Sequence, residues 1–162
     1  MRDAISRFLT IDALAVAAAL YLVLAPDASE GADGRDKETP GVKIRLLTED
    51  TVLTATLVDN AATRDFVSLL PLDLTLRDHA STEKVSDLPS RLATRGTPDG
   101  VDPEIGDIAY YAPWGNLAIY YRDFGYSKGL VKLGRIDSGI EKLARRGGKF
   151  IVRFEVADKG AR

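Results

Sequence analysis

Residues 106–126, GDIAYYAPWGNLAIYYRDFGY, decide the fold of this chain. Two runs of alternating side chains, IAYYA and LAIYY, surround the sequence PWGN. Proline presets one backbone angle of a tight turn, and glycine or asparagine takes the positive φ that such a turn requires. The stretch therefore predicts a β-hairpin whose turn is formed by Pro113–Asn116.

This hairpin holds seven of the chain's twelve aromatic side chains. Because successive side chains of a strand point to opposite faces, each of its two strands sends one tyrosine inward and one outward. An inward tyrosine fills the core and needs a hydrogen-bond partner for its hydroxyl. The outward tyrosines, with Trp114 at the turn, either pack across the two strands or form a surface that contacts a ligand.

Alternating apolar and polar residues recur outside the hairpin, which predicts further strands. The segments VKIRLL (42–47) and VLTATLV (52–58) alternate, with a turn expected between them at Glu49 and Asp50. Leu72, Leu74 and Leu76 alternate with polar residues, and the segment 150–156 alternates in the same way near the end of the chain.

Two segments have the pattern of short helices instead. Residues 60–71 place apolar side chains on one helical face and stop at Pro71. Residues 137–148 offer Ser138 and Glu141 at the spacing of a capping box. Many short strands with two short helices predict a mainly β protein, a closed and mostly antiparallel β-barrel with two short α-helices.

Composition excludes several classes of function. The formal net charge is −2, from 22 basic and 24 acidic residues, so we expect no nucleic-acid partner. The absence of cysteine excludes disulfides, thiol nucleophiles and cysteine-bound zinc. His79 is the single histidine, and Asp102, Glu104 and Asp107 lack the spacing of a calcium loop. We therefore expect neither a metal site nor a cofactor.

The first 25 residues have the layout of a secretory signal. Arg2 and Arg7 precede Ala13–Ala25, a run of thirteen apolar residues. This run is shorter than the roughly twenty residues that a membrane-spanning helix needs. We expect residues 1–25 to be a signal-peptide-like segment, and hence an exported protein, periplasmic or secreted. The alternatives are that Ala13–Ala25 is an uncleaved membrane anchor, the one case in which a membrane is a partner, or that the protein is cytoplasmic.

The remaining chain divides into three parts. Residues 26–41 are rich in Asp, Gly and Glu and predict a flexible linker, because they cannot bury apolar surface. Residues 42–158 are expected to form the barrel domain, and residues 159–162 a short tail.

Two long stretches carry a family resemblance. They are residues 54–89, TATLVDNAATRDFVSLLPLDLTLRDHASTEKVSDLP, and residues 106–143, which begin with the aromatic hairpin. They resemble the small bacterial cyclophilin-like domain family, over about residues 43–156. The resemblance implies the β-barrel of cyclophilins and members that are mostly of uncharacterised function. His79 departs from the family pattern, in which a tyrosine is expected at this position.

The candidate site follows from the outward side of the hairpin and the loop near the single histidine. We predict a groove whose lining includes Tyr111, Trp114, Tyr120, Tyr121, Arg122, His79 and Glu83. No individual catalytic residue is predicted.

Three functions remain open at this point. The first is a non-enzymatic module that binds a small molecule or a peptide. The second is a diverged peptidyl-prolyl isomerase or another enzyme. Members of the true cyclophilins use an arginine near a Phe-x-Phe-x-Gln stretch, and this chain contains no glutamine. This departure from the cyclophilin pattern argues against prolyl isomerisation by the usual residues. The third is an accessory protein that acts beside a redox partner.

Overall fold

A computed structural model describes residues 41–157 of the chain. The predicted signal-like segment 1–25, nearly all of the linker 26–41 and the tail 159–162 lie outside the described residues. Their assignments, and the export that they imply, stay predictions. Among the described residues, no helix has both the length and the hydropathy needed to cross a membrane.

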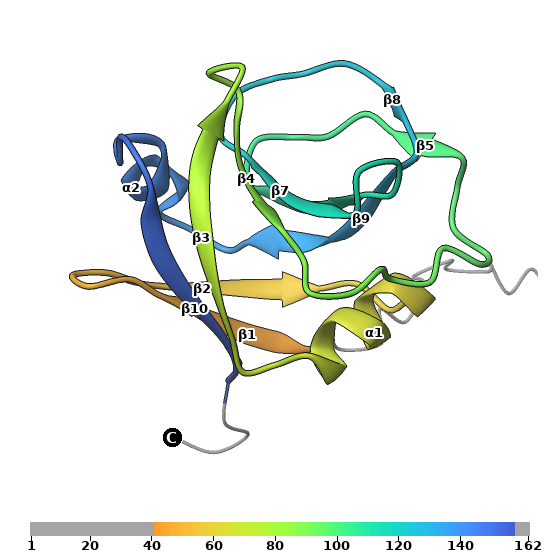
Figure 1. Ribbon diagram of the computed structural model, residues 1–162, viewed down its shortest axis with the longest axis horizontal. Coiled ribbons are helices and arrows are strands. Elements are labelled where there is room, and N and C mark those ends of the chain that lie inside the picture. Colours follow the sequence, from red (N-terminus) through yellow and green to blue (C-terminus); the bar gives the residue numbers. More distant parts are fainter. Residues whose placement is uncertain (1–40, 158–162) are drawn as a thin grey trace, which may run out of the picture. The chain divides into compact units, whose positions relative to one another are not determined.

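Eight strands close into a barrel in the order β1-β10-β3-β4-β7-β6-β9-β2 (Figure 1). Each strand is antiparallel to both of its neighbours in the barrel. The barrel strands are β1 (Lys43–Leu47), β2 (Val52–Leu57), β3 (Leu72–His79), β4 (Glu83–Asp87), β6 (Asp107–Tyr111), β7 (Asn116–Tyr120), β9 (Leu130–Ile136) and β10 (Phe150–Val156). Two short strands, β5 (Gly100–Val101) and β8 (Ser127–Lys128), form a separate antiparallel pair. The predicted closed barrel is confirmed.

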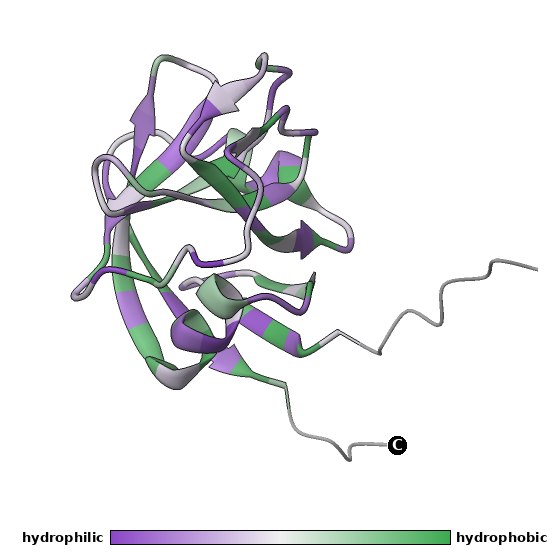
Figure 2. Ribbon diagram, turned by 90° about the vertical axis from the view of Figure 1, so that its right-hand side faces the viewer, coloured by the Kyte–Doolittle hydropathy of each residue, from purple (hydrophilic) through white to green (hydrophobic). Residues whose placement is uncertain are grey.

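The alternation in the sequence places the core inside the barrel. Ile44 and Leu46 of β1 are fully buried, as are Val152 and Phe154 of β10, while Ile151, directly before Val152, is exposed. Hydrophilic and hydrophobic bands accordingly alternate along the barrel strands in Figure 2. The period of two that predicts the strands is thus also the pattern that fills the interior.

The two predicted helices are present and lie on opposite sides of the barrel in Figure 1. Helix α1 (Ala61–Ser68) begins at Asn60, whose side-chain oxygen accepts a hydrogen bond of 2.8 Å from the backbone N–H of Thr63. Phe66 packs edge-on against Phe154, with 5.9 Å between the ring centroids, and anchors α1 to the core.

Helix α2 (Ile140–Ala144) does not begin as the sequence predicts. The residue that precedes its first turn is Gly139, at φ 84°, and no side chain in the described part of the chain caps the helix. The predicted capping box from Ser138 to Glu141 is therefore wrong. A Cβ at position 139 would lie 2.9 Å from Leu53 Cδ2, so the barrel approaches the helix start closely. The left-handed backbone favours glycine, and a larger residue would also require the Leu53 side chain to shift.

The aromatic hairpin divides its tyrosines between the two faces as predicted. Tyr110 is buried in the core, and its hydroxyl accepts a hydrogen bond of 3.3 Å from the backbone N–H of Leu92. Tyr120 points to the outer face of the barrel, where it joins a second, smaller apolar cluster. Gly115 takes the positive φ, 74°, that the turn requires.

Candidate functional site

A second apolar cluster lies on the outer wall of the barrel, across β4, β6, β7 and β9. It consists of Val85, Ala109, Ala118, Tyr120 and Leu130. Side chains on the outside of a barrel are buried only if something covers them. Here Val101 of β5 packs on the cluster, and the backbone N–H of Gly129 donates to the carbonyl of Asp99. The pair β5–β8 is thus held over part of the outer wall.

The uncovered part of this wall is a pocket of about 150 Å³. Val85 of β4 and Ala118 of β7 are direct partners in the sheet. The next pair on the same face is Glu83 and Tyr120. The small side chain of Ala118 leaves space between larger neighbours. The complete lining is His79, Glu83, Val85, Tyr111, Trp114, Asn116, Ala118, Tyr120, Phe124 and Ser127.

A tight hairpin turn brings His79 and Glu83 to the same edge of this pocket. The two residues are partners across β3 and β4, and the backbone N–H of Thr82 donates to the carbonyl of His79. Ala80 and Ser81 between them have φ values of 50° and 56°. A turn with two left-handed central residues normally contains glycine or asparagine. This hairpin therefore carries local backbone strain beside the pocket.

The carboxylate of Glu83 lies in an unusual environment. The side chain is buried, and its Oε2 atom has no hydrogen-bond partner among residues 41–157. Burial raises the pKa of the Glu83 carboxyl, and the charge that His79 can carry opposes this shift. Asn116, also buried, presents a second acceptor, Oδ1, that likewise lacks a partner within the described part of the chain. The pocket wall thus contains two buried acceptors that no donor within residues 41–157 satisfies.

Aromatic rings form the rim of the pocket. Trp114 packs edge-on against both Tyr111 and His79, with ring centroids 5.4 Å and 5.6 Å away. Tyr120 packs against Phe124 at 5.7 Å. Burial, followed by the nearby Glu83 and Tyr111, raises the pKa of the Tyr120 hydroxyl. Trp114 itself is 63% exposed, so a large apolar surface faces the solvent beside the opening.

The structure brings five of the seven predicted site residues together at this pocket: His79, Glu83, Tyr111, Trp114 and Tyr120. Alternation could also have identified Asn116, which shares the outward face of β7 with Ala118 and Tyr120. Phe124 and Ser127 follow β7 in a segment without a regular period, so no sequence pattern places them.

Tyr121 and Arg122 do not line the pocket. Tyr121 follows the inward face of the hairpin, and its hydroxyl donates a hydrogen bond of 2.7 Å to Asp78 Oδ1. Burial and this hydrogen bond raise the pKa of the Tyr121 hydroxyl to about 12. Arg122 is exposed, and its backbone N–H donates to the carbonyl of Thr82. Because neighbouring residues of a strand face opposite sides, Tyr120 and Tyr121 cannot both belong to one surface.

Lys84, adjacent to Glu83, points the other way and is fully buried. Its Nζ atom lies 2.7 Å from Asp78 Oδ1 and also donates to the carbonyl of Arg146. The rings of Tyr121 and Phe150 lie 5.1 Å and 5.7 Å from Nζ. Neighbouring residues of β4 thus serve two purposes, since Glu83 faces the pocket while Lys84 joins a buried polar cluster.

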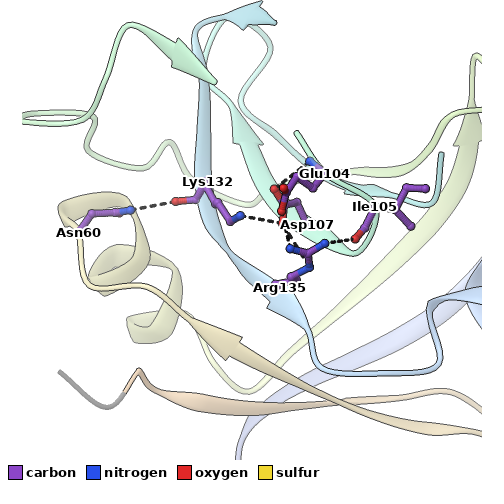
Figure 3. Close-up of polar contacts among 6 residues, drawn as sticks. All are labelled: Asn60, Glu104, Ile105, Asp107, Lys132 and Arg135. Atoms are coloured by element: carbon purple, nitrogen blue, oxygen red, sulfur yellow. Dashed lines mark hydrogen bonds and ion pairs between the residues drawn. The ribbon is translucent and has the colours of Figure 1, made fainter. Parts of the chain in front are cut away.

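Two of the acidic residues that we considered as cation ligands are engaged with basic side chains instead. Figure 3 shows Asp107 between Lys132 and Arg135, with Lys132 Nζ 2.9 Å from Asp107 Oδ1. Arg135 also pairs with Glu104 and donates to the carbonyl of Ile105. These carboxylates are therefore part of an ion-pair network across β6 and β9.

The environment of Glu83 predicts an unusual effect on stability. A carboxyl whose pKa is raised on folding weakens the folded state once the pH exceeds its unfolded-state pKa of about 4.3. We expect Glu83→Gln to remove this cost and to raise the free energy of unfolding at pH 7 by about 1 kcal/mol. The gain should shrink as the pH falls through the raised folded-state pKa, and it should be lost below about pH 4, where both states bind the proton.

Urea denaturation of the full chain at pH 7 and pH 4 measures this difference. Glu49→Gln, at an exposed turn residue, is the matched control and should leave stability unchanged at both pH values. A variant Glu83→Gln that is less stable than wild type at pH 7 would show that the carboxylate holds the fold together.

A closed antiparallel barrel of eight strands with two helices is the architecture of a small β-barrel domain of the cyclophilin type. The chain belongs to the cyclophilin-like family, whose family model matches residues 46–155. The predicted family is thereby confirmed.

Among solved structures, the solution structure of a hypothetical protein from Archaeoglobus fulgidus is similar, with a TM-score of 0.54 and 18% sequence identity. The likeness covers 72% of this chain and 95% of that chain, and it shows a shared fold. No curated protein matches this sequence.

Proposed function

We propose that this protein is a non-enzymatic binding module that holds a small molecule or part of a peptide in the pocket on the outer wall of the barrel. The observation that carries the proposal is the pair of buried acceptors, Glu83 Oε2 and Asn116 Oδ1, in one aromatic pocket. A buried polar atom without a partner costs roughly 1–3 kcal/mol. A ligand that supplies donors would recover this free energy.

The size of the pocket limits what it can hold. Its volume of about 150 Å³ equals that of an engineered protein cavity, about 150 Å³, that binds benzene. Pockets for drug-sized ligands occupy roughly 300–1,000 Å³. We therefore infer that the pocket receives one chemical group, while the rest of the ligand lies along the exposed surface around Trp114.

The lining supports binding better than prolyl isomerisation. Within residues 41–157, no arginine lines the pocket, and Arg122, the nearest candidate by sequence, lies outside it. Its walls instead combine aromatic rings with unsatisfied acceptors, which is the composition of a recognition site.

The test is a ligand panel observed by ¹⁵N chemical shifts of the full-length chain. The panel contains small cations, small anions, neutral amides and prolyl peptides. We expect at least one class to shift the signals of Trp114, Asn116 and Ala118. Ala118→Leu, which places a larger side chain in the pocket, should abolish the response. Ile151→Ala, at an exposed site on β10, is the control and should respond as wild type does.

Two outcomes would contradict this proposal. The first is a panel that leaves the pocket signals unchanged in the wild-type chain. The second is an equal response from a folded Ala118→Leu variant, which would place binding elsewhere. Uncatalysed cis–trans exchange of a prolyl peptide takes roughly tens to hundreds of seconds. Faster exchange in the presence of the protein would favour the isomerase alternative.

A further inference from the structure

We propose that the group recognised by the outer-wall pocket is a guanidinium, as carried by an arginine side chain or an alkylguanidine. This inference rests on the proposed function, because it names the chemistry of the ligand that the same pocket would bind.

The pocket wall lacks hydrogen-bond donors for two of its buried acceptors. An ionised carboxylate only accepts hydrogen bonds, and so does the side-chain oxygen of asparagine. Glu83 Oε2 and Asn116 Oδ1 are both buried and lack donors among residues 41–157. A complementary ligand must therefore present N–H or O–H donors toward this wall. Anions and ligands rich in carbonyl groups would leave both acceptors unsatisfied.

The charge of the pocket wall favours a cationic ligand. Glu83 is a buried carboxylate, and a buried charge is stable only when it is paired and hydrogen-bonded. Tyr111, Trp114 and Tyr120 line the same pocket, and the faces of aromatic rings attract cations. A positively charged ligand would satisfy the carboxylate and the rings at the same time, which a neutral donor would not.

The residues that carry the two acceptors are well separated along the sheet. Glu83 lies opposite Tyr120, and Asn116 lies four residues before Tyr120 on the same strand. At about 3.3 Å per residue, the backbone positions are roughly 13 Å apart along the sheet, with Val85 and Ala118 between them. The two acceptors therefore belong to side chains at opposite ends of this run of strand pairs.

This arrangement favours a guanidinium over an ammonium. A guanidinium is a planar fork of N–H donors that can bond in several directions, whereas an ammonium is a compact and strongly hydrated charge. A flat group also stacks on aromatic rings and fits a space comparable to one that holds benzene.

The experiment titrates the full-length chain with three capped amino acids and follows the same pocket signals. The probes are N-acetyl-arginine-methylamide, its neutral isostere N-acetyl-citrulline-methylamide, and N-acetyl-lysine-methylamide. We expect the arginine probe to bind about tenfold or more tightly than either of the others. Glu83→Gln should weaken binding of the arginine probe by about tenfold or more, and Ile151→Ala should leave it unchanged.

Two further probes distinguish the source of the guanidinium. Ethylguanidinium that binds as tightly as the arginine probe would indicate a small-molecule ligand. A tripeptide with central arginine that binds more tightly would indicate a peptide partner, and both results support recognition of the guanidinium itself.

Equal affinity for the arginine and citrulline probes would overturn this inference, and so would a folded Glu83→Gln variant that binds arginine as wild type does. If another class of the panel binds while guanidinium does not, the binding module stands and only its ligand is different. If nothing binds, both proposals fail.

Discussion

Replacing Asp78 by asparagine is expected to lower the free energy of unfolding by about 3 kcal/mol, because it leaves the ammonium group of Lys84 buried without a counter-charge. Lys84 is fully buried, and its Nζ atom lies 2.7 Å from the Asp78 carboxylate. Asparagine keeps the shape and an acceptor oxygen at this position, so the loss reports on charge. Urea denaturation at pH 7 measures it.

Replacing the other partner of the pair, Lys84→Met, should lower the free energy of unfolding by less, about 1 kcal/mol. Most of this loss comes from the hydrogen bond to the carbonyl of Arg146. The reason is that the Asp78 side chain is 41% exposed, so water can solvate its charge when the lysine is absent. The asymmetry between the two variants is the specific expectation. Equal losses would show that the pair contributes through its shape and packing rather than through the buried charge.

The effect of Asp78→Asn should also depend on pH. Burial opposes ionisation of Asp78, but hydrogen bonds from Lys84 and Tyr121 outweigh it, and the pKa of the Asp78 carboxyl is lowered. A carboxyl with a lowered pKa stabilises the folded state above its unfolded-state pKa of about 3.9, and this contribution is lost as the pH falls through the folded-state value. The difference between wild type and variant should therefore be full at pH 7 and shrink progressively below about pH 4.

Gly134→Ala is expected to destabilise the barrel by about 3 kcal/mol, through a clash between two strands. A Cβ atom at this position of β9 would lie 2.4 Å from the carbonyl oxygen of Thr56 and 2.7 Å from Leu57 Cα. Both are backbone atoms of β2, which pairs with β9 here, so no rotation of a side chain can relieve the contact. The strands would have to separate.

Gly125→Ala is the matched control, since a Cβ there meets nothing within 4 Å. It should leave stability unchanged or raise it by about 0.4–1 kcal/mol, because alanine restricts the unfolded chain. Chemical denaturation of both variants makes the comparison. A variant Gly134→Ala as stable as Gly125→Ala would show that β2 and β9 can move apart at little cost.

Much of the barrel could be predicted because its information is local. A strand with one face inward must alternate apolar and polar side chains, and this pattern is visible for β1, β2, β3 and β10 without knowledge of their partners. The same rule divides Tyr110 from Tyr111 and Tyr120 from Tyr121. Because Tyr121 follows Tyr120, the same rule places Tyr121 on the face opposite to the pocket, and the predicted groove should not have included both residues.

The start of α2 could not be predicted from the same kind of pattern. Ser138 and Glu141 have the spacing of a capping box, yet Gly139, with φ 84° and in close contact with the side chain of Leu53, takes the capping position. The pattern near the helix does not reveal this contact, because Leu53 lies 86 residues before Gly139 in the chain.

The sequence by itself determined the family, the closed barrel and the two faces of the aromatic hairpin. Only the tertiary structure decided that Glu83 and Asn116 share a pocket, that the adjacent Lys84 is buried on the opposite side of β4, and that β9 needs a glycine beside β2. The physical reason is the same in each case. Alternation assigns a side chain to a face, but the packing of distant strands and loops on that face determines whether it meets water, a counter-charge or an empty pocket.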